Sequence, residues 1–421
     1  MRKTRCHSTS EIARNVKNFE TWSTYQHCEE AAYKDMPDEL EPDIKKVFNV
    51  HRKLPAEWMD QSCEAYQSLK SYVTADFLDF LDNAYHASPK LFSPKVLAKD
   101  SQDLLSDIQC VYAAWKRLQK MRSSSRRWSE ADYVANVYNV FRSPALNESD
   151  YRAQCSMSLP QPLSDNALTL KAIKSLNAKT ASPDGAIFIP TRFIRELSHS
   201  STSPYKLLKT HPNVADSGSA GGESSFRYQS TPCANLPDTA TFEFASAFWE
   251  DKKPLHHMLE DAYRQNRMAT TAAVRQLHSL NVQAPIFGLV WSQGKVRAHV
   301  DWWTVKPDAA YPTVRSAAYP GRKGDRRRTS GIFHEWNLEE PNDMLEVFLL
   351  IRNIDRWTIG RFRERVIAGV NQLCDDVIQG RHQFQPWKRR GDLAQLIYDG
   401  PASLDSTVQP AAPPTRRSKR R

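Results

Sequence analysis

The sequence predicts an α/β fold, from three observations. Residues 181–189 and 241–246 are short runs rich in β-branched and aromatic side chains, which is typical of strands. Residues 255–280 carry apolar side chains at the spacing of a long helix. Residues 285–303 contain two further apolar runs around a Gln-Gly pair, which predicts a β-hairpin. Strands that alternate with long helices indicate a mixed central sheet flanked by helices.

Composition predicts a folded protein with an acidic partner. The chain has 421 residues, 40% hydrophobic content and eleven tryptophans, which is enough for two or three domains with a real core. Its formal net charge is +10, and nucleic acid is the usual partner of such an excess. Five basic residues lie in the terminal run 415–421, so the rest carries only 10 − 5 = +5. Much of the net positive charge therefore lies in the C-terminal tail.

Cysteine usage and the absence of targeting patterns predict an intracellular protein. The seven cysteines are scattered, and none has the spacing of a zinc site, which indicates reduced thiols. Residues 1–15 lack the apolar core of a secretory signal, and no apolar run approaches the length of a transmembrane helix, so we expect no membrane partner. A basic run near the end predicts a nuclear location, through Arg416, Arg417, Lys419, Arg420 and Arg421.

The N-terminal part predicts helices and no chemistry. Residues 1–40 are polar without a sustained period, so we expect loose order. Residues 41–122 show helical spacing and predict a region that packs against the rest or contacts a protein partner. The clearest apolar stripe consists of Leu104, Ile108, Val111, Trp115 and Leu118.

The remaining segments complete the predicted order. After a Ser/Arg linker, Ser129 is the expected N-cap of a helix, with Asp132 three residues on, and Glu130 in the first turn complements the helix dipole. Residues 199–240 are rich in Ser, Gly, Pro and Asn, which predicts a loop insertion. Residues 342–374 are strongly helical. The last segment, 391–421, predicts a flexible basic tail.

Two carboxylates stand out, one on each of the first two predicted strands. Asp184 and Glu243, if brought together from adjacent strands, can hold a hard divalent cation through oxygen ligands. A group two residues after Glu243 shares its face of the strand, and that group is Ala245, which has no chemistry to offer. The alternative interpretation stays open: a turn aspartate before a strand, and a solvated glutamate on an edge.

The pair resembles the signature of the PD-(D/E)XK nucleases. Pro183-Asp184 matches the first motif, and Glu243-Phe244-Ala245 matches Glu-x-Lys except at the lysine. In that family the Asp and Glu bind Mg²⁺, and the Lys orients the attacking water. The predicted order of a helix, a strand with Asp, a strand with Glu, a long helix and a strand pair is also similar to the family's core.

Several stretches are similar to one fungal group, the PD-(D/E)XK nuclease-like domain proteins. They are Trp128–Tyr133, Ser182–Ile187, Ser230–Glu243, Gln265 with Ala272, Pro285–Val290 and Ile351–Trp357. The likeness covers roughly residues 126–390 and implies a restriction-endonuclease-like core with a mixed central sheet, preceded by an α-helical N-terminal region.

The resemblance also implies a site and a cofactor. Asp184 and Glu243 would be catalytic metal ligands for Mg²⁺ or Mn²⁺, Glu130 a third acid, and Gln265 would face the site from the long helix. The missing lysine implies a nucleic-acid-binding protein with weak or lost nuclease activity, because one positioned charge is typically worth on the order of 10²–10³ in rate.

Two alternatives remain open at this point. One is an active Mg²⁺-dependent DNA endonuclease whose cation comes from elsewhere, with Lys252, Lys253, Arg264 and Arg267 as candidates. The other is a non-catalytic interaction scaffold. DNA is the more expected nucleic acid. A basic loop can contact phosphates or simply face solvent, with Arg322, Lys323, Arg326, Arg327 and Arg328 as its cations.

Overall fold

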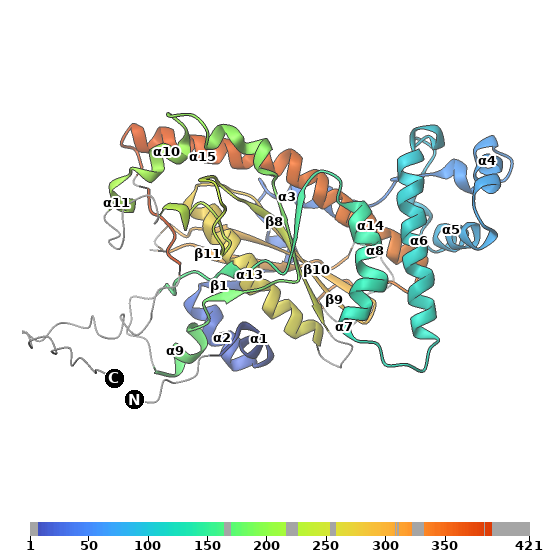
Figure 1. Cartoon of the computed structure of the whole chain (residues 1–421), viewed down its shortest axis with the longest axis horizontal. Helices are drawn as coiled ribbons and strands as arrows, with labels where there is room; N and C mark the ends of the chain where they lie inside the picture. Colours follow the sequence, from blue (N-terminus) through green and yellow to red (C-terminus); the bar gives the residue numbers. More distant parts are fainter. Residues whose placement is uncertain are drawn as a thin grey trace, which may run out of the picture.

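A mixed sheet lies at the centre of the chain (Figure 1). The computed structural model describes residues 7–163, 170–215, 226–252, 258–307, 309, 311–321, 332–382 and 384–389. In that part of the chain the sheet strands are β1 (Cys28–Glu30), β4 (Asp150–Ala153), β7 (Gly185–Phe188), β8 (Ala245–Lys252), β9 (Ile286–Ser292), β10 (Lys295–Thr304), β11 (Thr313–Ala318) and β12 (Trp336–Asn337). Their order is β1-β11-β10-β9-β8-β7-β4, and β12 pairs with β10.

Two antiparallel meanders make up most of this sheet. Strands β4, β7 and β8 form the first, and β9, β10 and β11 form the second. The meanders join through the parallel pairing of β8 with β9, and the crossover between them is helix α13 (Met258–Ser279). Two-residue strands form separate small pairs, β2 (Leu54–Pro55) with β3 (Phe92–Ser93) and β5 (Met157–Ser158) with β6 (Thr180–Ala181).

Helices cover both faces of the sheet. Neighbouring residues of β9 point to opposite faces, so Gly288 lies under Asn266 of α13 while Phe287 packs against Trp357 on the other side. Trp357 ends α14 (Pro341–Trp357), which continues through a π-helical turn into α15 (Arg363–Ile378). The predicted α/β class, with a mixed central sheet flanked by helices, is confirmed.

The predicted hairpin is also confirmed. Strands β9 and β10 pair antiparallel across Gln293 and Gly294, whose φ angles are 52° and 72°. Positive φ at both central residues is the geometry of a two-residue type I′ turn, which matches the twist of paired strands. The hydroxyl of Tyr138 accepts a hydrogen bond from the N–H of Gly294 at 3.0 Å and fixes the turn to the neighbouring helix.

The loose order expected for residues 1–40 is wrong for the described residues from His7 onward. They form α1 (Thr9–Arg14), α2 (Val16–Tyr25) and the edge strand β1, which pairs in parallel with β11. Ser8 begins α1 with a capping box, in which Glu11 accepts from the Ser8 N–H at 2.8 Å. Side chains of α1 and α2, including Ile12 and Trp22, are buried in the main core.

Residues 41–122 are helical, as predicted, but they do not form a separate unit. The helices are α3 (Glu41–Val47), α4 (Glu64–Tyr72), α5 (Ala75–Ala87) and α6 (Gln102–Arg122). The stripe on α6 is buried at Ile108, Val111 and Leu118. These residues belong to the same continuous hydrophobic core as the sheet, and Figure 1 shows α6 beside α14 and α8 (Asn139–Ala145).

Three other predicted segments differ or lie outside the described residues. The insertion 199–240 contains α10 (Pro204–Lys209) and α11 (Pro212–Ala215), because Tyr205 packs against Phe226 and Phe242 instead of facing solvent. The loop cations of residues 322–328 and the whole tail 391–421, including the basic run, lie outside the described residues. Among the helices described, none has the length and apolar character to cross a membrane.

Candidate functional site

Asp184 and Glu243, predicted to share one metal site, lie at opposite ends of the strands that carry them. The first residue of β7, directly after Asp184, pairs near the C-terminal end of β8, whereas Ala245 at the start of β8 pairs with the last residue of β7. Strand β8 has eight residues. Such a strand is about 23 Å long at ~3.3 Å per residue. Glu243 lies before Ala245, so its assignment to a site shared with Asp184 is wrong.

Glu243 is buried and belongs instead to a structural ion pair with the half-buried Arg152. Arg152 on β4 donates to its Oε1 at 2.6 Å, and Thr231 donates to Oε2 at 2.5 Å. The backbone carbonyl of Glu243 accepts from Gln276 of α13 at 3.0 Å. Both carboxylate oxygens are therefore committed to fixing the lead-in to β8. Ala245, at the position where a lysine was expected, is buried in the core.

Glu250 is the strand carboxylate that lies beside Asp184. Gly185 pairs with Trp249 in the antiparallel register, which sets Asp184 opposite Glu250. The approach of the strands is close, since a Cβ on Gly185 would lie 1.8 Å from Nε1 of Trp249. The backbone N–H of Asp251 donates to Oδ2 of Asp184 at 2.7 Å. This hydrogen bond ties the two strand ends together.

Glu250, Lys252 and Gln265 form a chain of contacts at this point. Glu250 and Lys252 are two residues apart on β8, so they share a face of the strand. Nζ of Lys252 forms an ion pair with Oε1 of Glu250 and donates to Oε1 of Gln265 at 3.1 Å. Gln265, from the N-terminal half of α13, also accepts from Oγ of Ser10 at 3.1 Å. The Glu-x-Lys pattern is thus complete at residues 250–252.

Asp251, between the two site residues, points away and is neutralised by Arg142. The guanidinium of Arg142 donates to both carboxylate oxygens of Asp251, at 2.6 and 3.0 Å, and both side chains are only 3% exposed. The guanidinium also stacks on aromatic rings and lies 3.9 Å from the ring centre of Trp291. This buried pair allows three consecutive charged residues to occupy the end of a central strand.

Burial makes the two site carboxyls hard to ionise. The pKa of Asp184 is raised from 3.8 to about 6, mainly by burial and then by the negative charge of Asp251, with Glu130 adding to it. The N–H of Asp251 and the charge of Lys252 act in the opposite direction. The pKa of Glu250 is raised well above its usual value, again mainly by burial, and Lys252 opposes that rise. A cation beside both groups would restore their ionised forms.

Glu130 and Gln265 each interact with one residue of this cluster, Glu130 with Asp184 through its charge and Gln265 with Lys252 through a hydrogen bond. Glu130 is in the first turn of α7 (Glu130–Tyr133) and is close enough for its charge to raise the pKa of Asp184. The predicted cap of this helix is confirmed, since Oγ of Ser129 accepts from the N–H of Asp132 at 3.2 Å in a capping box. The described structure therefore sets Glu130 close enough to Asp184 for its charge to act there, and it connects Gln265 with Glu250 through Lys252. Glu250, and not Glu243, lies opposite Asp184.

The stability of an Asp184→Asn variant tests the raised pKa. Because the folded-state pKa exceeds the ordinary one, ionisation of Asp184 opposes folding, and this penalty develops as pH rises from about 4 to about 6. Asparagine stays neutral, so we expect the variant to be more stable than wild type at pH 7.5, by up to about 3 kcal/mol, and equal to it near pH 4. Urea unfolding at both pH values measures this, with the exposed Asp79→Asn as control. A variant less stable than wild type at pH 7.5 would contradict it.

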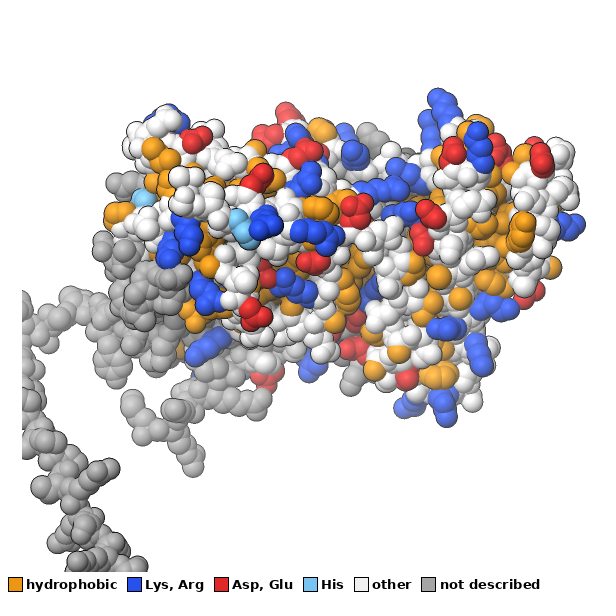
Figure 2. Space-filling model, turned by 45° about the horizontal axis from the view of Figure 1, so that its top comes forward, with side chains coloured by type: hydrophobic (Ala, Val, Ile, Leu, Met, Phe, Trp, Pro, Cys, Tyr) orange, Lys and Arg blue, Asp and Glu red, His pale blue; other side chains and the backbone are white. Residues whose placement is uncertain are grey.

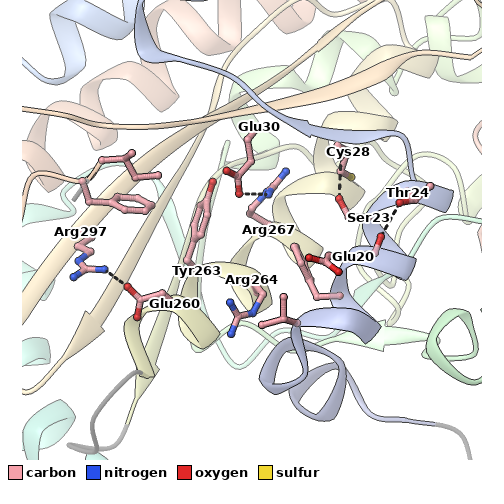
Figure 3. A pocket seen from close by; sticks show the side chains of 14 residues that line it. Glu20, Ser23, Thr24, Cys28, Glu30, Glu260, Tyr263, Arg264, Arg267 and Arg297 are labelled. Atoms are coloured by element: carbon pink, nitrogen blue, oxygen red, sulfur yellow. Dashed lines mark hydrogen bonds and ion pairs between the residues drawn. The ribbon is translucent and has the colours of Figure 1, made fainter. Parts of the chain in front are cut away.

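Both arginines among the four candidate cations line a different pocket. Figure 3 shows Arg264 and Arg267 in a cavity of about 620 Å³ between α2, α13 and β10. Arg267 is buried and pairs with Glu30 at 3.3 Å, and Arg264 donates to the carbonyl of Ala13 at 2.5 Å. Lys253 lies outside the described residues. Among the four candidates, Lys252 is the cation found beside Asp184 and Gln265.

The carboxylates fit a hard divalent cation. Oε2 of Glu250 is buried and has no hydrogen-bond partner within the described part of the chain, which is unfavourable unless a ligand takes it up. No group of three His, Cys, Asp or Glu side chains there forms a complete cage. Mg²⁺ does not require one, since it is usually held by one or two carboxylates and keeps several waters. Asp184 and Glu250 supply that number.

Sequence reasoning missed Glu250 for a local reason. The run Glu250-Asp-Lys-Lys253 has four consecutive charged residues, which is typical of a solvated loop, whereas Phe242-Glu-Phe-Ala alternates like a strand. The usable signal was the apolar pair Phe248-Trp249 directly before Glu250, which continues the strand to a second Glu-x-Lys match.

Charges on one face of the molecule are mixed. Figure 2 presents the side that lies at the top of Figure 1, where basic and acidic side chains are interspersed over the visible surface without a single-sign stripe. A nucleic-acid partner usually requires clustered cations. This visible face therefore gives no support to nucleic-acid binding there.

No protein-family model matches the chain, and no curated protein matches it significantly.

Proposed function

We propose that the protein is a metal-dependent phosphodiesterase of the PD-(D/E)XK type that acts on DNA. The observation that supports this most directly is the convergence of Asp184 with Glu250, Lys252 and Gln265 at the ends of β7 and β8. The arrangement of α7, the meander β4-β7-β8, α13 and the parallel strand β9 is similar to the order expected of that core. The proposed ligand pair is Asp184 and Glu250, not Asp184 and Glu243.

The proposed roles follow from where each side chain lies. Asp184 and Glu250 would hold Mg²⁺ or Mn²⁺, with Glu130 close enough to contribute charge. When bound, such a cation makes coordinated water more acidic and neutralises charge on a phosphate. Lys252 holds a positive charge beside Glu250, suited to orienting a water and to stabilising the charged phosphate. Gln265 positions the Lys252 ammonium through its Oε1.

Cleavage by purified protein, with and without the lysine, tests the proposal. We expect wild type to cleave single- or double-stranded DNA with Mg²⁺ or Mn²⁺ and to stop on addition of EDTA. Lys252→Met should lower the rate by on the order of 10²–10³, since it removes one positioned charge. Lys116→Met is the matched control, because Lys116 pairs with Asp76 on the helical region. No cleavage by wild type under any of these conditions would refute the proposal.

The structure offers a lysine for the two hypotheses that lacked one, the weakly active protein and the non-catalytic scaffold. The lysine missing at Ala245 lay behind the first of these and favoured the second, whereas Lys252 lies two residues after Glu250 and pairs with it. We therefore favour the active enzyme with a relocated cation. A nuclear location is part of the proposal and depends on the basic run at Arg416–Arg421. Microscopy of a fluorescent fusion with and without that run tests it.

A further inference from the structure

A polar groove of about 680 Å³ borders the candidate site on the side of Gln265. Residues 7–14, which include α1, form one wall, and residues 177–182, which lead from α9 (Leu170–Leu176) toward Asp184, form the other. Figure 1 shows α1, α2 and α9 side by side next to α13, and α1 packs directly on α13. One wall of the groove is thus built by the N-terminal segment whose order the sequence did not predict.

The groove shares a side chain with the candidate site. Oε1 of Gln265 accepts from Nζ of Lys252 and from Oγ of Ser10, both at 3.1 Å. Ser182 at the other wall is two residues before Asp184. A polymer whose scissile phosphate lies at Asp184 and Lys252 therefore has this groove directly beside it.

The lining suits a sugar–phosphate backbone and not a base. Hydroxyl side chains come from both walls: Ser8, Thr9, Ser10, Thr180 and Ser182. Arg14 and Lys179 are exposed and form no ion pair with a described residue, whereas the carboxylate of Glu11 is held by the N–H of Ser8 at 2.8 Å. The lining residues include no Phe, Tyr or Trp on which a base would stack. Hydroxyls and cations of this kind bind phosphates without reading sequence.

We propose that a single strand of DNA runs from the candidate site into this groove and is held by its backbone through Arg14 and Lys179. This inference rests on the proposed function. Arg14 from one wall and Lys179 from the other border the same groove of about 680 Å³, which suits one backbone held between them. The substrate class is therefore single-stranded DNA, or a duplex end that has been unpaired.

The salt dependence of binding tests the two contacts. Binding of a short fluorescent single strand is measured in EDTA, where cleavage does not interfere, for Arg14→Ala and Lys179→Ala. The slope of log affinity against log salt is negative. Each lost phosphate contact should make it shallower by about 0.7, and the double variant should make it shallower by about twice that. Matched controls are Lys17→Ala on α2 and Lys174→Ala on α9, two exposed lysines outside the groove, whose slopes should equal that of wild type.

Further readouts separate this inference from the proposed function. Equal slopes for the groove and control variants would overturn the groove, whether or not the protein cleaves DNA. A blunt duplex that competes as well as the single strand would overturn the assignment to one strand. Bis(p-nitrophenyl) phosphate, a small diester that does not need the groove, reports on catalysis alone. Altered slopes without cleavage of either substrate would support the groove and refute the proposed enzyme.

Discussion

Glu250→Gln is expected to abolish metal-dependent cleavage, whereas Glu243→Gln should leave the activity of the folded protein unchanged. The first variant removes a carboxylate beside Asp184 whose Oε2 is buried without a described partner. The second acts at the far end of β8, where the carboxylate pairs with Arg152. Loss of a metal ligand should lower the rate by roughly 10²-fold or more.

Metal-dependent stability separates binding from chemistry in these variants. A cation at about 100 times its dissociation constant stabilises the folded state by about 2.7 kcal/mol. We expect Mg²⁺ or Mn²⁺ to raise the unfolding free energy of wild type and Glu243→Gln, but not that of Glu250→Gln. Glu243→Gln should be less stable without metal, because Arg152 loses its charged partner. Activity retained in Glu250→Gln and lost in Glu243→Gln would return the site to the residues first inferred from the sequence.

The misassignment of Glu243 shows which information a local pattern lacks. Ala245 lies two residues after Glu243, and Lys252 lies two residues after Glu250, so both glutamates resemble the motif locally. The strand register decides which glutamate lies beside Asp184. That register depends on the contact between Gly185 and Trp249, which are far apart in sequence. Moving along a strand by seven residues shifts a side chain by about 23 Å at ~3.3 Å per residue. A sequence match to both motifs can therefore include a glutamate that lies too far from the aspartate to share its site.

Elements with strong local signals were predicted correctly. The turn at Gln293 and Gly294, the capping box at Ser129 and the stripe on α6 each depend on residues close in sequence. The strand β1 has no such signal, because Cys-Glu-Glu is short and polar, and it is ordered by pairing with β11 almost 300 residues later. Order in residues 7–40, and with it the groove beside Gln265, comes from burial of Ile12 and Trp22 in a distant core.

Arg142→Met should be among the most destabilising single changes in the protein. It leaves Asp251 with an uncompensated charge at 3% exposure, next to Asp184 and Glu250, which are themselves raised in pKa. Breaking a buried ion pair on one side typically costs about 3–5 kcal/mol. It also removes the stacking of the guanidinium on Trp291. Urea unfolding at pH 7.5 measures the loss, and Arg352→Met, whose pair with Asp107 is less buried, is the control.

Two further variants show whether the buried charge, and not lost packing, causes that effect. Replacing both partners, as in Arg142→Met with Asp251→Leu, should recover most of the stability, because hydrophobic replacement of a buried pair is often neutral. Arg142→Met alone should also raise the pKa of Asp184 further, since the charge of Asp251 already raises it. The pH at which metal binding begins would then move upward. A loss in Arg142→Met no larger than in Arg352→Met would mean that Asp251 is not held by this pair, and the anchoring of Glu250 and Lys252 would need another explanation.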